Sequence, residues 1–223
     1  MILKPTDRKS WLVARQQGLG GSDAGAAIGA NKYKSNVDLW REKAGLTEPE
    51  DISAKPAVRF GKEAEQHIRA LFMLEHPEFT VDYHEFYMYL NNTYPFIYAT
   101  LDGELTDENR RRGILEIKTA TIQNPAQWGE WFDDDGYPKI PDSYYAQILH
   151  QLAATGWEYV VLVAYIRVAY AYATEGSAKA RLFERRVERA DVEADINFLI
   201  GQEAAFWQAV KDKKQPPRLL PEI

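Results

Sequence analysis

Several stretches of this chain carry apolar residues at the spacing of a helical turn, and they predict its helices. The longest stretch ends before Pro77, and its inward-facing stripe includes Ala64, Ile68 and Phe72. A second apolar stripe, which includes Leu199, lies in the segment over residues 189–213. In order, the expected helices cover residues 9–17, 24–28, 36–44, 58–76, 144–155 and 189–213.

Alternating or continuous apolar runs predict strands over residues 79–90, 98–105, 113–119, 158–166, 170–174 and 180–187. Residues 159–165 are apolar throughout, which is typical of a central strand covered on both faces. The order of elements predicts an α/β fold, with a central mixed β-sheet flanked by helices. We expect a single domain over residues 1–223, with C-terminal strands and a helix over about 170–213 and a tail at 215–223.

The most informative pattern is a predicted hairpin between residues 98 and 121, joined by a polar turn at 106–112. Strand side chains alternate between faces, so Glu116 and Lys118 share one face while the apolar neighbours Leu115 and Ile117 share the other. The partner strand carries Asp102, which we expect to lie near Glu116 and Lys118.

Two carboxylates on adjacent strands can bind a hard divalent cation such as Mg²⁺, which prefers oxygen ligands and retains several waters. A bound water can then attack a phosphodiester, while the ion stabilises the charge that develops on the phosphate oxygens. Lys118 could orient or deprotonate that water, or neutralise the phosphate. The ordinary alternative is an exposed hairpin with a Glu–Lys face.

A glycine-rich turn at residues 18–21 predicts a second site near the start of the chain. Ser22 and Asp23 are expected to cap the helix over 24–28, where free backbone N–H groups could bind an anion. Arg15 and Ser22 would reach the same place and hold a phosphate. Alternatively, the glycines only permit a tight turn and Arg15 is solvated.

Three further polar residues lie beside apolar helical stripes. Glu65 falls on the inward face of the helix over 58–76, where a carboxylate needs a metal, Lys118 or another partner. Alternatively, it reaches water or pairs with Arg69. Gln147 and Gln151 lie one turn apart and could donate to phosphate oxygens, or they are ordinary boundary residues.

The composition narrows the class of protein. Hydrophobic residues make up 45% of the 223 positions, so a substantial core is expected. The absence of cysteine removes disulfides, thiolate metal sites and cysteine nucleophiles, and fits a reducing cytoplasm. No leader peptide or membrane span is expected. A formal charge of −6 argues against a general nucleic-acid coat protein, but allows a local basic groove.

The segment over residues 123–142 is expected to be irregular. It places Trp128, Trp131 and Phe132 beside the acidic run 133–135. Exposed aromatic residues of this kind would suit a lid or a subunit contact. Burial in the core is at least as plausible, and the sequence leaves both readings open.

Four motifs in order resemble the lambda-exonuclease-like branch of the PD-(D/E)xK nuclease superfamily, the YqaJ-like phage recombination exonucleases. The resemblance covers about residues 11–165 and rests on Trp11-Leu12-x-x-Arg15 with Gly20-Gly21-Ser22-Asp23-Ala24, on Phe60-Gly61-Lys62-Glu63-Ala64-Glu65, on Leu101-Asp102-Gly103 with Leu115-Glu116-Ile117-Lys118, and on Tyr144-Tyr145-Ala146-Gln147 followed by Gln151. Each motif is weak alone, but their order and spacing are specific.

The resemblance implies a role for each matching residue. Mg²⁺, with Mn²⁺ as a substitute, would bind Asp102, Glu116 and the carbonyl of Ile117. Glu65 would lie at a second metal position or in its shell, and Lys118 would act on the attacking water. It further implies that a 5′-phosphate and the DNA would contact Arg15, Ser22, Thr100, Gln147 and Gln151, and that Val58 would be an apolar wedge at the duplex end. Leu101 and Thr100 depart from the proline and serine typical of the family, and the link from Asp102 to Glu116 is longer.

The implied activity is 5′→3′ digestion of one strand of linear double-stranded DNA to 5′-mononucleotides, leaving a 3′ single strand for an annealing protein. The resemblance also implies a homotrimer, and a phage or prophage protein in the cytoplasm of a bacterial host. An endonuclease of restriction or junction-resolving type is one alternative. The other is a catalytically silent DNA-binding module, against which intact Asp102, Glu116 and Lys118 argue.

Overall fold

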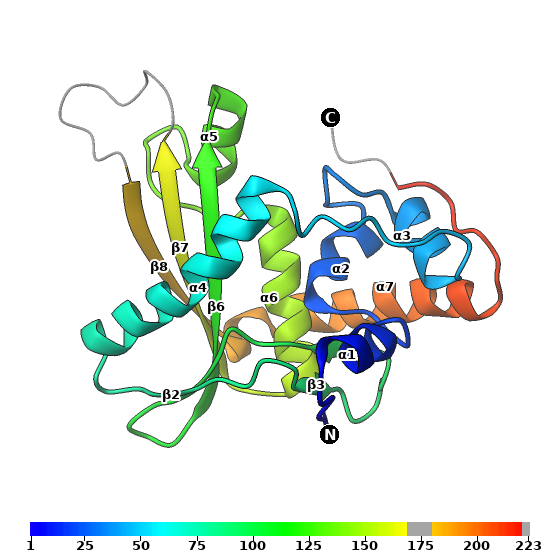
Figure 1. The fold of residues 1–223 in the computed structure, drawn as a ribbon, viewed down its shortest axis with the longest axis horizontal. Coiled ribbons are helices and arrows are strands. Elements are labelled where there is room, and N and C mark those ends of the chain that lie inside the picture. The colour runs from blue at the N-terminus through cyan, green and yellow to red at the C-terminus, as the bar shows by residue number, and fades with distance from the viewer. Residues whose placement is uncertain (169–179, 220–223) are drawn as a thin grey trace.

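The computed structural model describes residues 1–168 and 180–219, and its elements form a single α/β domain (Figure 1). The helices are α1 (Arg8–Arg15), α2 (Gly21–Ala27), α3 (Asn36–Lys43), α4 (Pro56–Glu75), α5 (Pro125–Trp131), α6 (Asp142–Thr155) and α7 (Glu193–Lys211), the last preceded by a 3-10 turn η1 (Arg189–Val192). The strands are β1 (Ile2–Leu3), β2 (Thr80–Asp82), β3 (Met88–Leu90), β4 (Tyr98–Ala99), β5 (Gly103–Thr106), β6 (Arg112–Ile122), β7 (Tyr159–Val168) and β8 (Ala180–Glu188).

The main sheet has five strands in the order β2-β5-β6-β7-β8. Strands β6 and β7 run parallel from the pair Gly113–Tyr159 to the pair Ile122–Val168, and the other neighbours are antiparallel. Residues 159–164 of β7 are all buried, which confirms the central strand expected from the apolar run. The mixed sheet with flanking helices is therefore confirmed.

Helices cover both faces of this sheet (Figure 1). On one face, Ile68 and Phe72 of α4 pack against a layer that includes Leu115 and Ile117 of β6. On the other face, Ile148 and Leu152 of α6 and residues of α7 pack against alternate residues of β6 and β7. Consecutive β6 side chains thus enter different cores, as strand alternation requires. Among the described residues, no helix is long and apolar enough to cross a bilayer.

Two of the expected strands are each divided between two sheets. The segment expected to form one strand over 79–90 contains β2, in the main sheet, and β3, which pairs with β1 and β4 in a separate small sheet. A turn in which the Tyr87 N–H donates to the His84 carbonyl separates them. Likewise, residues 98–105 form β4 in the small sheet and β5 in the main sheet, with Thr100 to Asp102 crossing between the sheets.

Two other expectations change in detail, and a third is not tested. Residues 123–142 are not wholly irregular, because Asn124 caps helix α5 by accepting from the Gln127 N–H at 3.0 Å. Trp131 and Phe132 are buried, so these two belong to the core and not to an exposed lid. The expected strand over 170–174 lies outside the described residues.

Gly113 marks a close approach between β6 and β7, and it generates a stability prediction. A Cβ at this position would overlap the ring of Tyr159, which is fully buried. Gly113→Ala should destabilise the fold by about 1–3 kcal/mol because the core cannot accept the added volume. Each kcal/mol corresponds to a loss of about 2–4 °C in Tm, measured by thermal unfolding.

The matched control is Gly201→Ala in α7, where an added Cβ has no neighbour within 4 Å. That change should stabilise the protein by about 0.5–1 kcal/mol, because alanine loses less backbone entropy in a helix. Equal Tm values for the two variants would contradict the packing argument.

Candidate active site

The site begins where β5 leaves the edge of β6. The two strands pair from Thr106–Arg112 only as far as Gly103–Leu115, and Asp102 stands immediately before this last pair. Its carboxylate accepts from the Ile117 N–H at 2.8 Å, on the part of β6 that β5 no longer covers. The N–H and C=O of a strand residue lie on the same side, so the Ile117 carbonyl also faces this notch.

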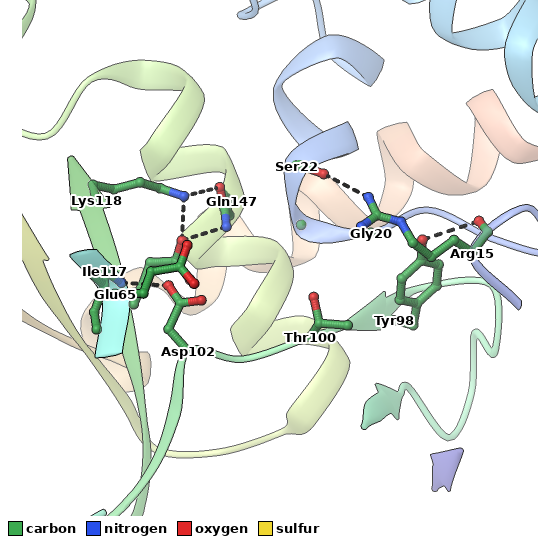
Figure 2. Close-up of a pocket in the computed structure, with 12 residues that line it drawn as sticks. Arg15, Gly20, Ser22, Glu65, Tyr98, Thr100, Asp102, Ile117, Lys118 and Gln147 are labelled. Atoms are coloured by element: carbon green, nitrogen blue, oxygen red, sulfur yellow. Dashed lines mark hydrogen bonds and ion pairs between the residues drawn. The ribbon is translucent and has the colours of Figure 1, made fainter. Parts of the chain in front are cut away.

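Glu116 lies beside Asp102 and is almost completely buried, with 3% of its surface exposed. Gln147 of α6 donates to one carboxylate oxygen at 2.6 Å, and Gln151, one turn later, donates to the other. Lys118 forms an ion pair with the first oxygen and donates to the Gln147 Oε1 at 3.0 Å (Figure 2). The carboxylate is therefore fixed in orientation by groups from two elements.

Glu65 of α4 reaches the same pocket from the other side of β6, as its inward position predicted (Figure 2). Burial first, and then the charges of Glu116 and Glu65, raise the pKa of Asp102 well above its usual value. Burial and the charge of Glu116 likewise raise the pKa of Glu65. Three carboxylates thus share one ammonium group, that of Lys118, and the pocket has an excess of negative charge.

Lys118 is held in its charged form. Burial alone would lower its pKa, but the carboxylates of Glu116 and Asp102 outweigh burial and raise the pKa above the usual value. An ammonium group has only donors to offer. In this arrangement Lys118 can orient a water or neutralise a phosphate, but it has no lone pair with which to remove a proton.

The other half of the pocket is basic and polar (Figure 2). Arg15, the last residue of α1, donates to the Ser22 hydroxyl at 3.3 Å, and its guanidinium lies 4.5 Å from the Trp11 ring centroid. Thr100 lines the pocket between this pair and the carboxylates. The whole cavity measures about 190 Å³ and joins the two halves. Such a space suits one phosphate group beside a cation.

The helix cap predicted here is wrong in one respect. Gly20, not Ser22, caps α2, and Ser22 lies within the first turn of the helix. The Asp23 carboxylate accepts from the Gly20 N–H at 3.0 Å and pairs with Lys43 at 2.8 Å. This use of Asp23 leaves the Ser22 hydroxyl to face Arg15. Gly20 is needed because a side chain there would press against the Tyr98 ring.

Two residues expected at the DNA-binding site lie outside the pocket lining. Gln151 is 1% exposed and lies behind Glu116, so it supports the carboxylate and does not reach a phosphate directly. Val58 lies in the first turn of α4 and is partly exposed, away from the carboxylates. The other predicted residues, which are Arg15, Ser22, Glu65, Thr100, Asp102, Glu116, Ile117, Lys118 and Gln147, all line the one cavity.

Sequence reasoning missed Tyr98 as a lining residue, whereas Gly20 and Gly21 belong to the glycine-rich turn that was expected at this site and do line the cavity. The close packing of Gly21 on Gln147 needs a tertiary contact that no local pattern reveals. The sequence also gave no sign of a second group, in which Glu75, His76 and Glu184 place ligand atoms within 4.8 Å of one another. Both His76 nitrogens face carboxylates, of Glu78 and Glu184, and these contacts raise its pKa although burial opposes them. Each imidazole nitrogen thus already has a carboxylate partner.

Comparison with known sequences identifies the family of this chain. The profile of the YqaJ-like viral recombinase domain matches residues 10–158, which include every residue of the pocket. The chain belongs to this family. A curated relative from Bacillus subtilis, the uncharacterized protein YqaJ, is 31% identical over 213 residues. The match covers 90% of this chain and 55% of that protein, so the chain spans about half the length of its relative.

Solved structures show the same fold. An alkaline exonuclease from Laribacter hongkongensis is 25% identical with a TM-score of 0.66, over 92% of this chain and 93% of that one. The same enzyme in complex with dAMP gives the same values. A phage-related exonuclease from Haemophilus somnus is 14% identical with a TM-score of 0.55, over 88% of this chain and 96% of that one, and supports the fold alone.

The crowding of carboxylates predicts that the site destabilises the metal-free protein. A carboxyl whose pKa is raised in the folded state costs stability above that pKa, and the cost disappears as pH falls through it. In EDTA at pH 8, Asp102→Asn should therefore raise stability by on the order of 1 kcal/mol, or about 2–4 °C in Tm. The gain should shrink as the pH is lowered, because wild-type Asp102 then becomes neutral as well.

Asp134→Asn, which removes an exposed carboxylate outside the pocket, is the control and should leave Tm almost unchanged. An Asp102→Asn variant that is less stable than wild type across the whole pH series would show that the carboxylate is not under repulsion.

Proposed function

We propose that this protein is a Mg²⁺-dependent 5′→3′ exonuclease on linear double-stranded DNA, which releases 5′-mononucleotides and leaves a 3′ single strand. The observation that carries the proposal is the single cavity that joins Asp102, Glu116 and Lys118 to Arg15 and Ser22. An enzyme that cuts at internal positions has no need to grip a terminal phosphate. The alkaline exonuclease with a similar fold binds dAMP, a nucleoside monophosphate like the proposed product.

The donor set suits a hard divalent cation. Glu116 and the Ile117 carbonyl offer oxygen atoms from β6, Asp102 offers others from the segment before β5, and Glu65 offers more from α4. Oxygen ligands favour Mg²⁺ or Mn²⁺ over softer metals. The raised pKa values of Asp102 and Glu65 fit a site whose negative charge awaits a cation. When bound, the ion would lower the pKa of a coordinated water and stabilise charge on the phosphate oxygens.

The side chains of the pocket would bind the strand and orient the attacking water. Arg15, Ser22 and Thr100 would hold the terminal 5′-phosphate, which places the next phosphate of the strand against the carboxylates. Water attacks that phosphorus, the bond to the 3′ oxygen of the terminal nucleotide breaks, and that oxygen takes up a proton. The ammonium group of Lys118 orients the water and offsets the developing charge, and Gln147 keeps Lys118 and Glu116 aligned. The shortened strand again ends in a 5′-phosphate.

The assembly and partners follow the family resemblance. We propose a homotrimeric ring around the DNA, an annealing protein that receives the 3′ strand, and action in the cytoplasm of a bacterial host. The low overall charge of −6 fits a ring whose channel alone is basic.

The first test is a time course with Mg²⁺ on linear and on closed circular duplex, read as product size. Wild type should release mononucleotides from the linear DNA and leave the circle intact. Asp102→Ala and Lys118→Ala should each reduce the rate by about 10³-fold or more, because transition-state charge loses its stabilisation. Lys211→Ala, on the exposed side of α7, should digest normally. Cleavage of the circle would favour an endonuclease, and full activity in either pocket variant would refute the assignment.

The second test concerns the terminal phosphate. Wild type should prefer 5′-phosphorylated over 5′-hydroxyl duplex ends, and Arg15→Ala should remove most of that preference with a smaller effect on hydroxyl ends. Arg8→Ala, at the exposed start of the same helix, serves as the control. The measurement is the ratio of kcat/KM for the two ends. If Arg15→Ala keeps the wild-type ratio, the phosphate pocket lies elsewhere.

A further inference from the structure

The edge of β6 remains open beyond the carboxylates. Pairing with β5 stops at Leu115, whereas β6 continues to Ile122, and among the described strands only β7 accompanies it over this last part. Alternate residues share a backbone direction, so Thr119 and Thr121 turn their N–H groups to the same edge as Ile117. In Figure 1, α4 crosses β6 and the C-terminal end of the strand extends past it. The open edge therefore leads directly out of the pocket.

An arginine lies beside the last residues of β6, on the side away from the open edge, and its side chain reaches Thr121. Arg167 of β7 is the register partner of Thr121 and donates to its hydroxyl at 2.9 Å. Its guanidinium lies 3.8 Å from the ring centroid of Phe60, in the first turns of α4, and that ring stacks on Tyr165. Gly61 of α4 packs closely on Thr119, because a Cβ added at Gly61 would lie only 3.1 Å from the Thr119 hydroxyl. The guanidinium is thus held in one orientation by three elements.

The charge of Arg167 is not balanced within the part of the chain that the structure describes. No carboxylate there pairs with it, although other stacked arginines such as Arg186 have acidic partners. Its Nε–H is buried and has no acceptor among the described residues. An oriented guanidinium with no carboxylate partner among the described residues is well suited to binding phosphate.

We propose that Arg167, with the open edge at Thr119 and Thr121, binds a phosphate of the degraded strand on the 3′ side of the scissile one. This inference rests on the proposed function. The terminal nucleotide would occupy the Arg15 side of the cavity, so the rest of the strand must leave across the carboxylates. The β6 edge offers that path, and Thr121 lies about 10 Å along it from Lys118.

The chemistry of this subsite is independent of sequence. Backbone N–H groups, a hydroxyl and a guanidinium all recognise phosphate oxygens and carry no information about the base. Phe60 keeps the guanidinium in place and thereby reduces the entropy lost when the phosphate binds. The subsite would hold the strand in register after each nucleotide is released.

Arg167→Gln tests the proposal, with Arg186→Gln as the matched control. Arg186 likewise stacks on an aromatic ring, that of Tyr159 in β7 at 3.8 Å from the centroid, and it lies near the opposite end of β7 from Arg167. Steady-state digestion of a 5′-phosphorylated linear duplex should show KM raised by about 5–20-fold in Arg167→Gln, as expected for one charged contact to phosphate, with a smaller change in kcat. Arg167→Lys should fall between this variant and wild type, and Arg186→Gln should match wild type.

A modified substrate locates the contact. One uncharged methylphosphonate replaces the linkage immediately 3′ to the first scissile phosphate in a duplex that is otherwise unchanged. This replacement should lower kcat/KM for wild type and Arg186→Gln by a factor similar to that of the arginine mutation, and should cost Arg167→Gln little more. If the methylphosphonate lowers kcat/KM only when Arg167 is present, then Arg167 and that phosphate interact directly.

Failure of the Arg167 subsite can be distinguished from failure of the proposed function. If Arg167→Gln and Arg186→Gln have the same KM, or if the methylphosphonate costs all variants equally, the subsite does not exist. If wild type leaves linear duplex undigested, the proposed function itself fails.

Discussion

Carboxylate repulsion at the notch beside β6 is the constraint on which the site depends. Asp102, Glu116 and Glu65 come from a crossing segment, a strand and a helix. Lys118 opposes the charge of all three, and Arg69 and Lys62 add to this at Glu65. Bringing them together costs free energy, which the rest of the domain must supply through packing. Amide donors from α6 reduce the cost at Glu116 by occupying both of its oxygens. In the proposed function, a bound cation would offset the remaining excess of negative charge.

One buried pair, His150 and Glu203, holds the surrounding scaffold in register with this notch. The His150 ring of α6 contacts the Tyr98 carbonyl at 2.8 Å on one side and the Glu203 carboxylate of α7 at 2.6 Å on the other, and both side chains are fully buried. Burial alone would lower the pKa of His150, but Glu203 outweighs it and raises the pKa. The pair fixes β4 against two helices, and β4 leads within a few residues to Thr100 and Asp102. Breaking such a pair is expensive because it leaves a bare charge in the core.

Local patterns predicted the parts of the site that lie on one element. Alternation placed Glu116 and Lys118 on one face of β6, and helical spacing placed Glu65 inward on α4; both placements are confirmed. The division of residues 98–105 between two sheets was not predictable from the local pattern. It arises because β4 pairs with β3 and β5 pairs with β6, and Thr100 to Asp102 must connect the two sheets. Ser22 was wrongly expected to be a cap, since Asp23 and Gly20 satisfy each other instead. Gln151 looked like a surface donor because its partner, Glu116, is remote in sequence.

The parallel pairing of β6 and β7 has an architectural consequence. Parallel neighbours require a crossover, and here the crossover carries α5, the loop over residues 132–141 and then α6. The floor of the pocket is built by α6, whereas α5 and the loop precede it along the same connection. No residue of the loop lines that cavity, and residues 137–140 instead line a separate hollow beside β8. Insertions or deletions in the exposed part of the loop would therefore alter that surface, while Gln147 and Gln151 keep their contacts with Glu116.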